Sequence, residues 1–334
     1  MRGAVTAPIY YHLTIFRYHK NIFSVDKYNL AAEASGSLLD GGSMRRGSTL
    51  LLIAPAILVI GIFMLIPMLI ALGYSFMTAD PYGGVQGPVT LDAYTQFLYQ
   101  RDFDDSLVFA PDYIFIILRS LYLAVATTAI CLVLGLPVAW YIVCQNEKRR
   151  RLLLFFITLP FWINTLIRTY CWILILRDEG LVNNGLRWLG LTDHPLPLLY
   201  TDGAILLGLV YTFLPFMVLP IYSTLERIDA RLIEAGHDLY AGRFNVFRLI
   251  IWPLARPGAL AGATLVFAPA LGSFLAPDLL GGGKKLLIGS LIQMQFTSSR
   301  NWPFGAALSI AITAVILLVM MLRAWTAPTR EVRT

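Results

Sequence analysis

Six long apolar stretches constrain this chain more than any other feature of its sequence. They occupy residues 50–77, 113–144, 152–176, 204–223, 257–277 and 303–325. Each approaches or exceeds the ~20 residues that a helix needs to cross the hydrocarbon core of a bilayer. Backbone N–H and C=O groups in lipid must bond within their own segment. The sequence therefore predicts an all-α integral membrane protein with six transmembrane helices.

The composition supports this class of protein and argues against others. Apolar residues make up 57% of the chain and charged residues only 14%, with a mean hydropathy of +0.67. A soluble domain is about half apolar and about a quarter charged. The net charge of +6 comes from basic residues at span ends, which membrane topology explains better than nucleic acid does. Because Cys131, Cys144 and Cys171 all lie in apolar stretches, we expect buried thiols and no disulfide framework.

The distribution of basic residues predicts the orientation and the domain limits. With the N-terminus inside, 18 of the 26 Lys and Arg residues lie on the inner side and 6 on the outer side. The positive-inside rule then places both termini in the cytoplasm. We expect a cytoplasmic extension over 1–49, a transmembrane domain over 50–325 and a cytoplasmic tail over 326–334. Met44 offers an alternative start, and we expect residues 1–43 to be dispensable.

Proline and glycine residues predict irregular spans. Pro137 should tilt or kink the second stretch, Pro215 should interrupt the fourth, and Pro269 with Gly272 should interrupt the fifth. Broken spans of this kind often line a transport path. Gly258-x-x-x-Gly262 permits close approach of another helix, or is a chance spacing in a glycine-rich chain.

The loop over 224–256 is the longest polar interruption in the C-terminal half. Tyr240, Phe244, Phe247 and Ile251 recur at spacings of four, three and four, which predicts one apolar stripe on a short amphipathic helix. The alternative is a solvated connection with one helical turn.

Several motifs resemble those of a known family. Glu234-Ala235, with Pro253 nineteen positions after the glutamate, resembles the EAA loop of permease subunits of ATP-binding cassette (ABC) importers. The segments LPFWINTLIRTYCWILIL (159–176), PALGSFLAPDLLGGGKKLLIG (269–289) and NWPFGAALSI (301–310) resemble the first permease of the spermidine/putrescine (polyamine) importer family. The resemblance implies a type I importer permease fold of the MetI-like kind. Branches that carry other small organic solutes or ferric iron remain alternatives.

This resemblance implies a coupling function for the loop. In that family the loop forms a helix that docks in a cleft of the cytoplasmic ATPase. The matching coupling residues are Glu234, Ala235, Gly236, Asp238, Gly242 and Pro253. The chain departs from the family pattern at Gly236, where Ala is usual, and at Tyr240, where Gly is usual. We therefore expect the bend to shift from Tyr240 to Gly242.

The resemblance also implies partners and a location. We expect a second homologous permease, two ATPase subunits that bind ATP and Mg, and an extracytoplasmic solute-binding protein. The chain itself should carry no cofactor, catalyse no reaction and bind no nucleic acid. Its expected location is the bacterial inner membrane.

Candidate substrate-path residues lie near the outer side. Asp278, near the outer end of the fifth stretch, could meet an ammonium group or be a helix-end carboxylate in headgroup water. Aromatic residues could stack on alkyl-ammonium groups or form an interface belt: Trp162, Tyr170, Trp172 and Tyr211. Arg168 lies within the third stretch, so we expect it to pair with a carboxylate.

Two other classes of membrane protein fit the sequence less well. An ion-coupled secondary transporter commonly carries buried coupling carboxylates, but the six spans hold few central charges. A membrane enzyme needs a cluster of His, Cys or carboxylates at one depth, and the sequence shows none. Gly281–Lys285 lacks the spacing of a phosphate-binding G-x-x-x-x-G-K-[ST] loop and indicates a flexible turn.

Overall fold

The structure is a computed structural model that describes residues 46–101, 107–109 and 111–326. The predicted dispensable segment 1–43 and the alternative start at Met44 lie outside these residues. The chain divides into two compact units, 1–68 and 69–334. Five helices of the described residues are long and apolar enough to cross a membrane, and a bent helix pair is a sixth candidate.

The described part of the first unit is the beginning of helix α2 (Arg46–Tyr74), which continues into the second unit. Residues 53–74 of this helix have a mean hydropathy of 2.8. Apolar side chains cover all of its faces, and consecutive residues such as Phe63 and Met64 are about 73% and 70% exposed. A helix that is apolar all round belongs in lipid or against other membrane helices.

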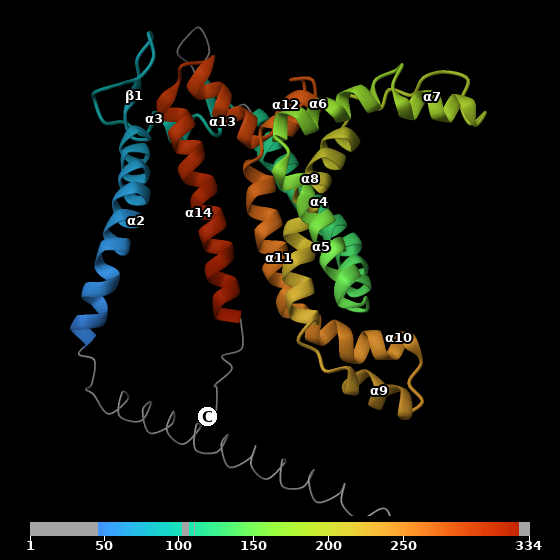
Figure 1. Cartoon of the computed structure of the whole chain (residues 1–334). Coiled ribbons are helices and arrows are strands. Elements are labelled where there is room, and N and C mark those ends of the chain that lie inside the picture. The colour runs from blue at the N-terminus through green and yellow to red at the C-terminus, as the bar shows by residue number, and fades with distance from the viewer. Residues whose placement is uncertain (1–45, 102–106, 110, 327–334) are drawn as a thin grey trace, which may run out of the picture. The chain divides into compact units, whose positions relative to one another are not determined.

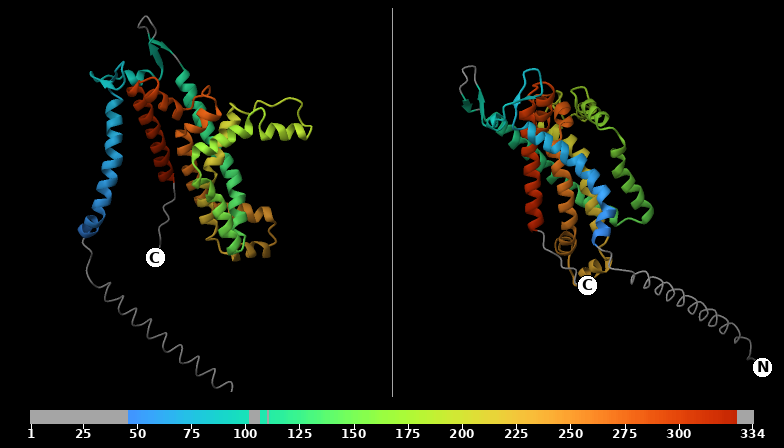
Figure 2. Two further views of the ribbon diagram at one scale, coloured as in Figure 1. Left: turned by 45° about the horizontal axis from the view of Figure 1, so that its top comes forward. Right: turned by 90° about the vertical axis from the view of Figure 1, so that its left-hand side faces the viewer.

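Three helices form the core of the second unit: α4 (Asp112–Val143), α8 (Asp202–Leu225) and α11 (Trp252–Gly272). They lie side by side in both sets of views (Figure 1 and Figure 2). Their shared interior buries Leu209, Met217 and Ile221 completely. Cys131 is also buried there, as expected, but Cys144 at the end of α4 and Cys171 are exposed, so the expectation of burial was wrong for those two.

Glycine brings α11 close to α8. A Cβ added to Gly258 would lie 2.4 Å from Thr224 Oγ1 and 2.6 Å from the carbonyl oxygen of Pro220. A Cβ added to Gly262 would lie 2.8 Å from Met217 Sδ. The prediction that this glycine pair permits close helix approach is therefore confirmed.

The third apolar stretch was predicted to be one continuous helix, but it forms two helices. Helix α5 (Glu147–Trp162) ends just after Pro160, and α6 (Thr165–Leu176) begins after an extended residue. Asn164 Oδ1 accepts the N–H of Leu166 at 2.8 Å and so starts the new helix. The two arms differ in direction by 95°, and α6 with α7 (Leu181–Trp188) turns away from the line of α5 (Figure 1).

The other predicted interruptions have different outcomes. Helix α8 runs unbroken through Pro215, so the predicted interruption of the fourth stretch was wrong. Proline lacks one N–H donor, but the rest of the helical hydrogen-bond pattern is intact. Helix α11 does end at Gly272, and Ser273 is extended before the short helix α12 (Leu275–Leu280). The predicted break near Pro269 and Gly272 is confirmed. Helix α4 is continuous through Pro137.

Seven further described elements precede α4 or follow α12, and of these α14 is another long apolar helix. They are β1 (Thr78–Ala79), β2 (Val85–Gln86), α3 (Asp92–Thr95), β3 (Tyr99–Arg101), β4 (Leu107–Phe109), α13 (Ile288–Thr297) and α14 (Trp302–Thr326). The strands form two antiparallel pairs, β1 with β2 and β3 with β4. In the first hairpin, the backbone N–H of Tyr82 and the amide of Gln86 donate to Asp80 and hold the pKa of its carboxyl below the ordinary value of 3.8.

Candidate functional site

The predicted coupling loop is two helices and a turn rather than one amphipathic helix. Helix α9 (Ala230–Asp238) begins at Asp229, whose carboxylate accepts the N–H of Arg231 at 3.0 Å. After a turn, α10 (Arg243–Val246) continues through a π-helical turn, η1 (Phe247–Ile251), directly into α11. Helices α9 and α10 lie side by side at one end of the unit (Figure 1). The predicted single stripe was wrong, because Tyr240 is 98% exposed whereas Ile251 is buried.

The turn between these helices is centred on Tyr240. Its φ is +58°, whereas Gly242 has a φ of −63°, so the predicted shift of the bend to Gly242 was wrong. The N–H of Tyr240 donates to the carbonyl of His237 at 2.9 Å, and the N–H of Ala241 donates to that of Gly236 at 3.1 Å. This pair of bonds closes a helix end in the way that usually requires glycine at the left-handed residue. A tyrosine there costs about 1–2 kcal/mol.

Five of the six predicted coupling residues lie on this two-helix unit, and the sixth, Pro253, lies in the first turn of α11. Gly236 is buried, and a Cβ there would lie 2.9 Å from Cδ1 of Ile250, the end of a flexible side chain. The other five are exposed: Glu234, Ala235, Asp238, Gly242 and Pro253. The turn also exposes Leu239, Tyr240 and Phe244. The loop thus presents acidic side chains and an apolar tip on one small surface.

The predicted aromatic residues only partly come together. The rings of Trp172 and Tyr211 lie 5.6 Å apart at 76°, which is an edge-to-face contact between α6 and α8. Trp162 is exposed at the end of α5 and Tyr170 is exposed on α6, and neither belongs to this pair. The bend after α5 separates Trp162 from the aromatic residues of α6.

Arg168 has a different environment from the predicted one. It is 8% exposed, its Nη2 donates to Thr165 Oγ1 at 3.0 Å, and its Cζ lies 5.9 Å from the centre of the Tyr211 ring. In the described part of the chain, Nε and Nη1 have no hydrogen-bond partner and no carboxylate lies within ion-pair distance. The prediction of an ion pair for Arg168 was therefore wrong within the described residues. The hydroxyl of Thr165 and the ring face of Tyr211 contact the guanidinium instead.

Asp278 lies beyond the break rather than on the fifth span itself. It belongs to α12, is half-buried, and its backbone N–H donates to the Phe274 carbonyl at 3.0 Å. A cavity of about 250 Å³ lies where α6, α8 and the α11–α12 break meet. Its polar lining comes from the hydroxyl groups of Thr165, Thr169, Thr212 and Ser273.

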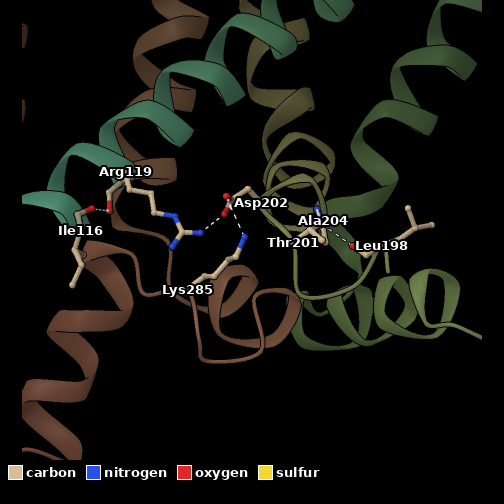
Figure 3. A network of polar contacts seen from close by, with 8 residues as sticks. Ile116, Arg119, Leu198, Thr201, Asp202, Ala204 and Lys285 are labelled. Carbon is tan, nitrogen blue, oxygen red and sulfur yellow. Dashed lines mark hydrogen bonds and ion pairs between the residues drawn. The ribbon is translucent and has the colours of Figure 1, made fainter. Parts of the chain in front are cut away.

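The structure contains a cluster of charged side chains that the sequence analysis did not predict. Arg119 on α4 and Lys285, between α12 and α13, both pair with Asp202 in the first turn of α8 (Figure 3). Lys285 Nζ lies 3.2 Å from Asp202 Oδ2, and Arg119 Nη2 donates to Oδ1. The available signal was Arg119 itself, because an arginine within a predicted span needs a partner.

Comparison with known proteins identifies the family. Residues 131–331 match the family described as "Binding-protein-dependent transport system inner membrane component". The spermidine/putrescine transport system permease protein PotB of Escherichia coli is 44% identical over 260 residues, which is 78% of this chain and 90% of that protein. PotB of Haemophilus influenzae is 42% identical, over 77% of this chain and 86% of that protein.

Solved structures show the same fold at lower identity. A bacterial ABC transporter for import of the acidic polysaccharide alginate matches with a TM-score of 0.59 and 18% identity, covering 83% of this chain and 94% of that one. The alginate transporter in complex with its alginate pentasaccharide-bound periplasmic protein matches with a TM-score of 0.62, 19% identity, and coverage of 83% and 93%. This likeness confirms the predicted type of permease fold. The chain therefore belongs to the family of binding-protein-dependent inner-membrane transport components, as a permease subunit of an ABC importer.

Proposed function

We propose that this chain is one of two permease subunits of an importer for polyamines such as spermidine and putrescine. The observation that carries the proposal is the 44% identity to PotB over most of both chains. The segments over 159–176 and 269–310, which resemble polyamine permeases, form the α6 helix, the α11–α12 break and the start of α14. The segments that resemble the polyamine branch thus form part of the lining of the cavity at the break, together with α8.

We propose further that the α9–α10 unit docks on a cytoplasmic ATPase. Glu234 and Asp238 lie one turn apart on α9, both exposed, beside the apolar tip of Leu239 and Tyr240. An exposed apolar group within a charged surface is typical of a protein contact. The unit continues without a break into α11, so a partner bound there is connected to a membrane span. This arrangement supports a cytoplasmic position for the loop and for both termini.

The proposed assembly contains further subunits. A second homologous permease would complete the pathway, and two ATPase subunits would bind ATP with Mg and hydrolyse it. A soluble binding protein would deliver the solute, and the periplasmic protein in the alginate transporter complex supports this part of the proposal. For the pathway itself, we propose Asp278, Trp172 and Tyr211, with Trp162 and Tyr170 as outer contacts.

Uptake by the complete system tests the proposal. The chain is co-expressed with the neighbouring permease, ATPase and binding-protein genes, and uptake of radiolabelled spermidine, putrescine, a sugar, an amino acid and ferric iron is measured. We expect ATP-dependent uptake of the two polyamines only. A complete system that moves another of these solutes and no polyamine would contradict the substrate assignment and leave the permease fold unaffected.

A further inference from the structure

The Arg119–Asp202–Lys285 cluster is unusual because two cations share one carboxylate. The side chains of Arg119 and Lys285 are about 27% and 33% exposed, whereas the side chain of Asp202 is about 51% exposed. The carboxylate is therefore the most accessible member of the cluster, and solvent reaches it while both of its partners are in place. Figure 3 shows Arg119 and Lys285 approaching Asp202 from different elements.

The two cations are held very differently. Arg119 is part of the long helix α4, and the next residue, Ser120, has its Oγ bonded to the carbonyl of Ile116 and accepts the N–H of Ile288 at 2.8 Å. Lys285 instead lies in the connection between α12 and α13. Gly282 and Gly283, just before it, have φ values of +65° and +67°. Arg119 is thus a partner of Asp202 on a long helix, and Lys285 is a partner on a glycine-containing connection whose end at Ile288 is bonded to Ser120.

The chemistry of Lys285 matches that of the proposed substrate. A lysine side chain is a primary ammonium on a flexible four-carbon stem. Putrescine, 1,4-diaminobutane, carries the same ammonium on the same four-carbon stem. The position of Lys285 Nζ, 3.2 Å from Asp202 Oδ2, is therefore one that a terminal ammonium of a polyamine can occupy with the same ion pair to Asp202.

An exchange of one ammonium for another avoids the main cost of opening an ion pair. Removing Lys285 alone would leave a half-exposed carboxylate with one fewer partner, which has a small free-energy cost. Replacement by a substrate ammonium keeps the charge of the cluster constant. The aromatic ring of Tyr200 lies against the connection that carries Lys285, because a Cβ on Gly282 would lie 2.5 Å from its Cδ1. Tyr200 is itself half exposed and can cover the methylene groups of a bound chain.

We propose that Asp202 is an ammonium-exchange site for the polyamine, and that Lys285 occupies it as a tethered substitute when no substrate is bound. This inference rests on the proposed polyamine function and assigns it a residue on α8 that the sequence patterns did not indicate. Lys285 acts as an intramolecular competitor with an effective concentration on the order of millimolar, as for a short flexible linker. The site is then weak, which suits a position that a transported solute must leave.

Equilibrium binding tests the exchange. Radiolabelled putrescine is titrated into the complete permease–ATPase complex in lipid nanodiscs, without the binding protein, so that only sites on the membrane complex contribute. Lys285→Gln should tighten binding several-fold because it removes the competitor. Asp202→Asn should weaken binding about tenfold, which is the contribution of one charge-assisted hydrogen bond. The double variant should bind as weakly as Asp202→Asn alone.

The matched control is Lys284→Gln, which removes the same charge from the neighbouring, exposed lysine and should leave binding unchanged. Opposite effects at Lys285 and Asp202 distinguish an exchange site from an ordinary stabilising ion pair, since loss of either partner of such a pair acts in one direction. Lys285→Gln keeps the Arg119–Asp202 pair, so it should assemble even if Asp202→Asn does not. Weaker or unchanged binding in Lys285→Gln would overturn the inference.

Uptake by the wild-type complete system separates this result from the proposed function. Polyamine uptake together with unaltered binding in every variant would overturn the exchange site alone and leave the polyamine assignment in place. Absence of polyamine uptake by the wild type would overturn the assignment and the exchange site with it.

Discussion

Two regions of the molecule differ in where glycine lies: the contact between helices α8 and α11, and the α9–α10 unit. At the α8–α11 contact, Gly258 and Gly262 lie so close to α8 that no further carbon atom fits. In the α9–α10 unit, the residue with a left-handed backbone is Tyr240, and its side chain is 98% exposed. The first region is determined by packing within the chain. The second carries a conformational cost and an exposed aromatic group that nothing within the described chain compensates, which indicates an external partner.

The largest effect should come from adding a methyl group at Gly258. The added Cβ of Gly258→Ala would meet the Pro220 carbonyl at 2.6 Å, and a backbone atom cannot move aside as a flexible side chain can. We expect a destabilisation of about 1–3 kcal/mol and a lower melting temperature of the purified complex. The control is Gly185→Ala on α7, where an added Cβ meets nothing within 4 Å. Equal stability of the two variants would contradict the close approach of the helices.

Reversing one charge on the α9–α10 unit should leave stability unchanged and affect coupling. Glu234 is exposed, so Glu234→Lys should preserve membrane insertion and melting temperature. We expect the ATPase to associate about tenfold more weakly, with a parallel loss of transport-coupled ATP hydrolysis. Glu147→Lys, the same change at an exposed glutamate of α5, serves as the control. If association and hydrolysis are normal in Glu234→Lys, this residue has no role in docking.

A smaller effect should follow from substitutions at Tyr240. Tyr240→Gly fits a φ of +58° without strain, whereas the β-branched Tyr240→Val should destabilise the turn by about 1–2 kcal/mol. Hydrogen exchange of the amides over 236–246 measures this difference directly. Both variants lack the aromatic ring, so both should weaken ATPase binding equally. Binding that is weak in Tyr240→Val and normal in Tyr240→Gly would show that the backbone matters and the ring does not.

The smallest effect should be that of Gly236→Ala. Here the added Cβ lies 2.9 Å from Cδ1 of Ile250, which is the end of a flexible side chain. The change gains about 1 kcal/mol of helix propensity, and movement of Ile250 offsets much of it. We expect a net change within about 0.5 kcal/mol in thermal unfolding. A loss as large as that of Gly258→Ala would show that the two regions are packed with the same rigidity.

The sequence predicted best those features that depend on lipid and on helix periodicity. The apolar stretches are helices, and the break after Gly272 and the close approach at Gly258 were both expected. The bend within the third stretch was not expected. In the sequence, Asn164 is a single polar residue in an apolar stretch, and its role as the start of a helix is visible only in the folded chain. The position of the loop bend was missed because glycine preference favoured Gly242 over Tyr240.

The candidate site was less predictable, because its contacts join distant segments. The partners of Arg168 include Tyr211, and those of Asp202 include Arg119 and Lys285, all far apart in sequence. Local pattern can show that a buried charge needs a partner but not which residue supplies it. Even so, the sequence alone indicates the permease class, since each motif, at 159–176, 269–289 and 301–310, is an uninterrupted run of residues.

The π-helical turn η1 has a mechanical consequence. Because it joins α10 to α11 without interruption, residues 243–272 form one continuous helical segment of 30 residues. The segment changes direction where α10 meets α11, so that α10 lies across the end of α11 (Figure 1). One end of the segment lies next to the exposed turn at Tyr240, and the other ends at Gly272, which lines the cavity at the α11–α12 break. A displacement of α10 is therefore passed to α11, and so to the cavity lining, through unbroken helical backbone.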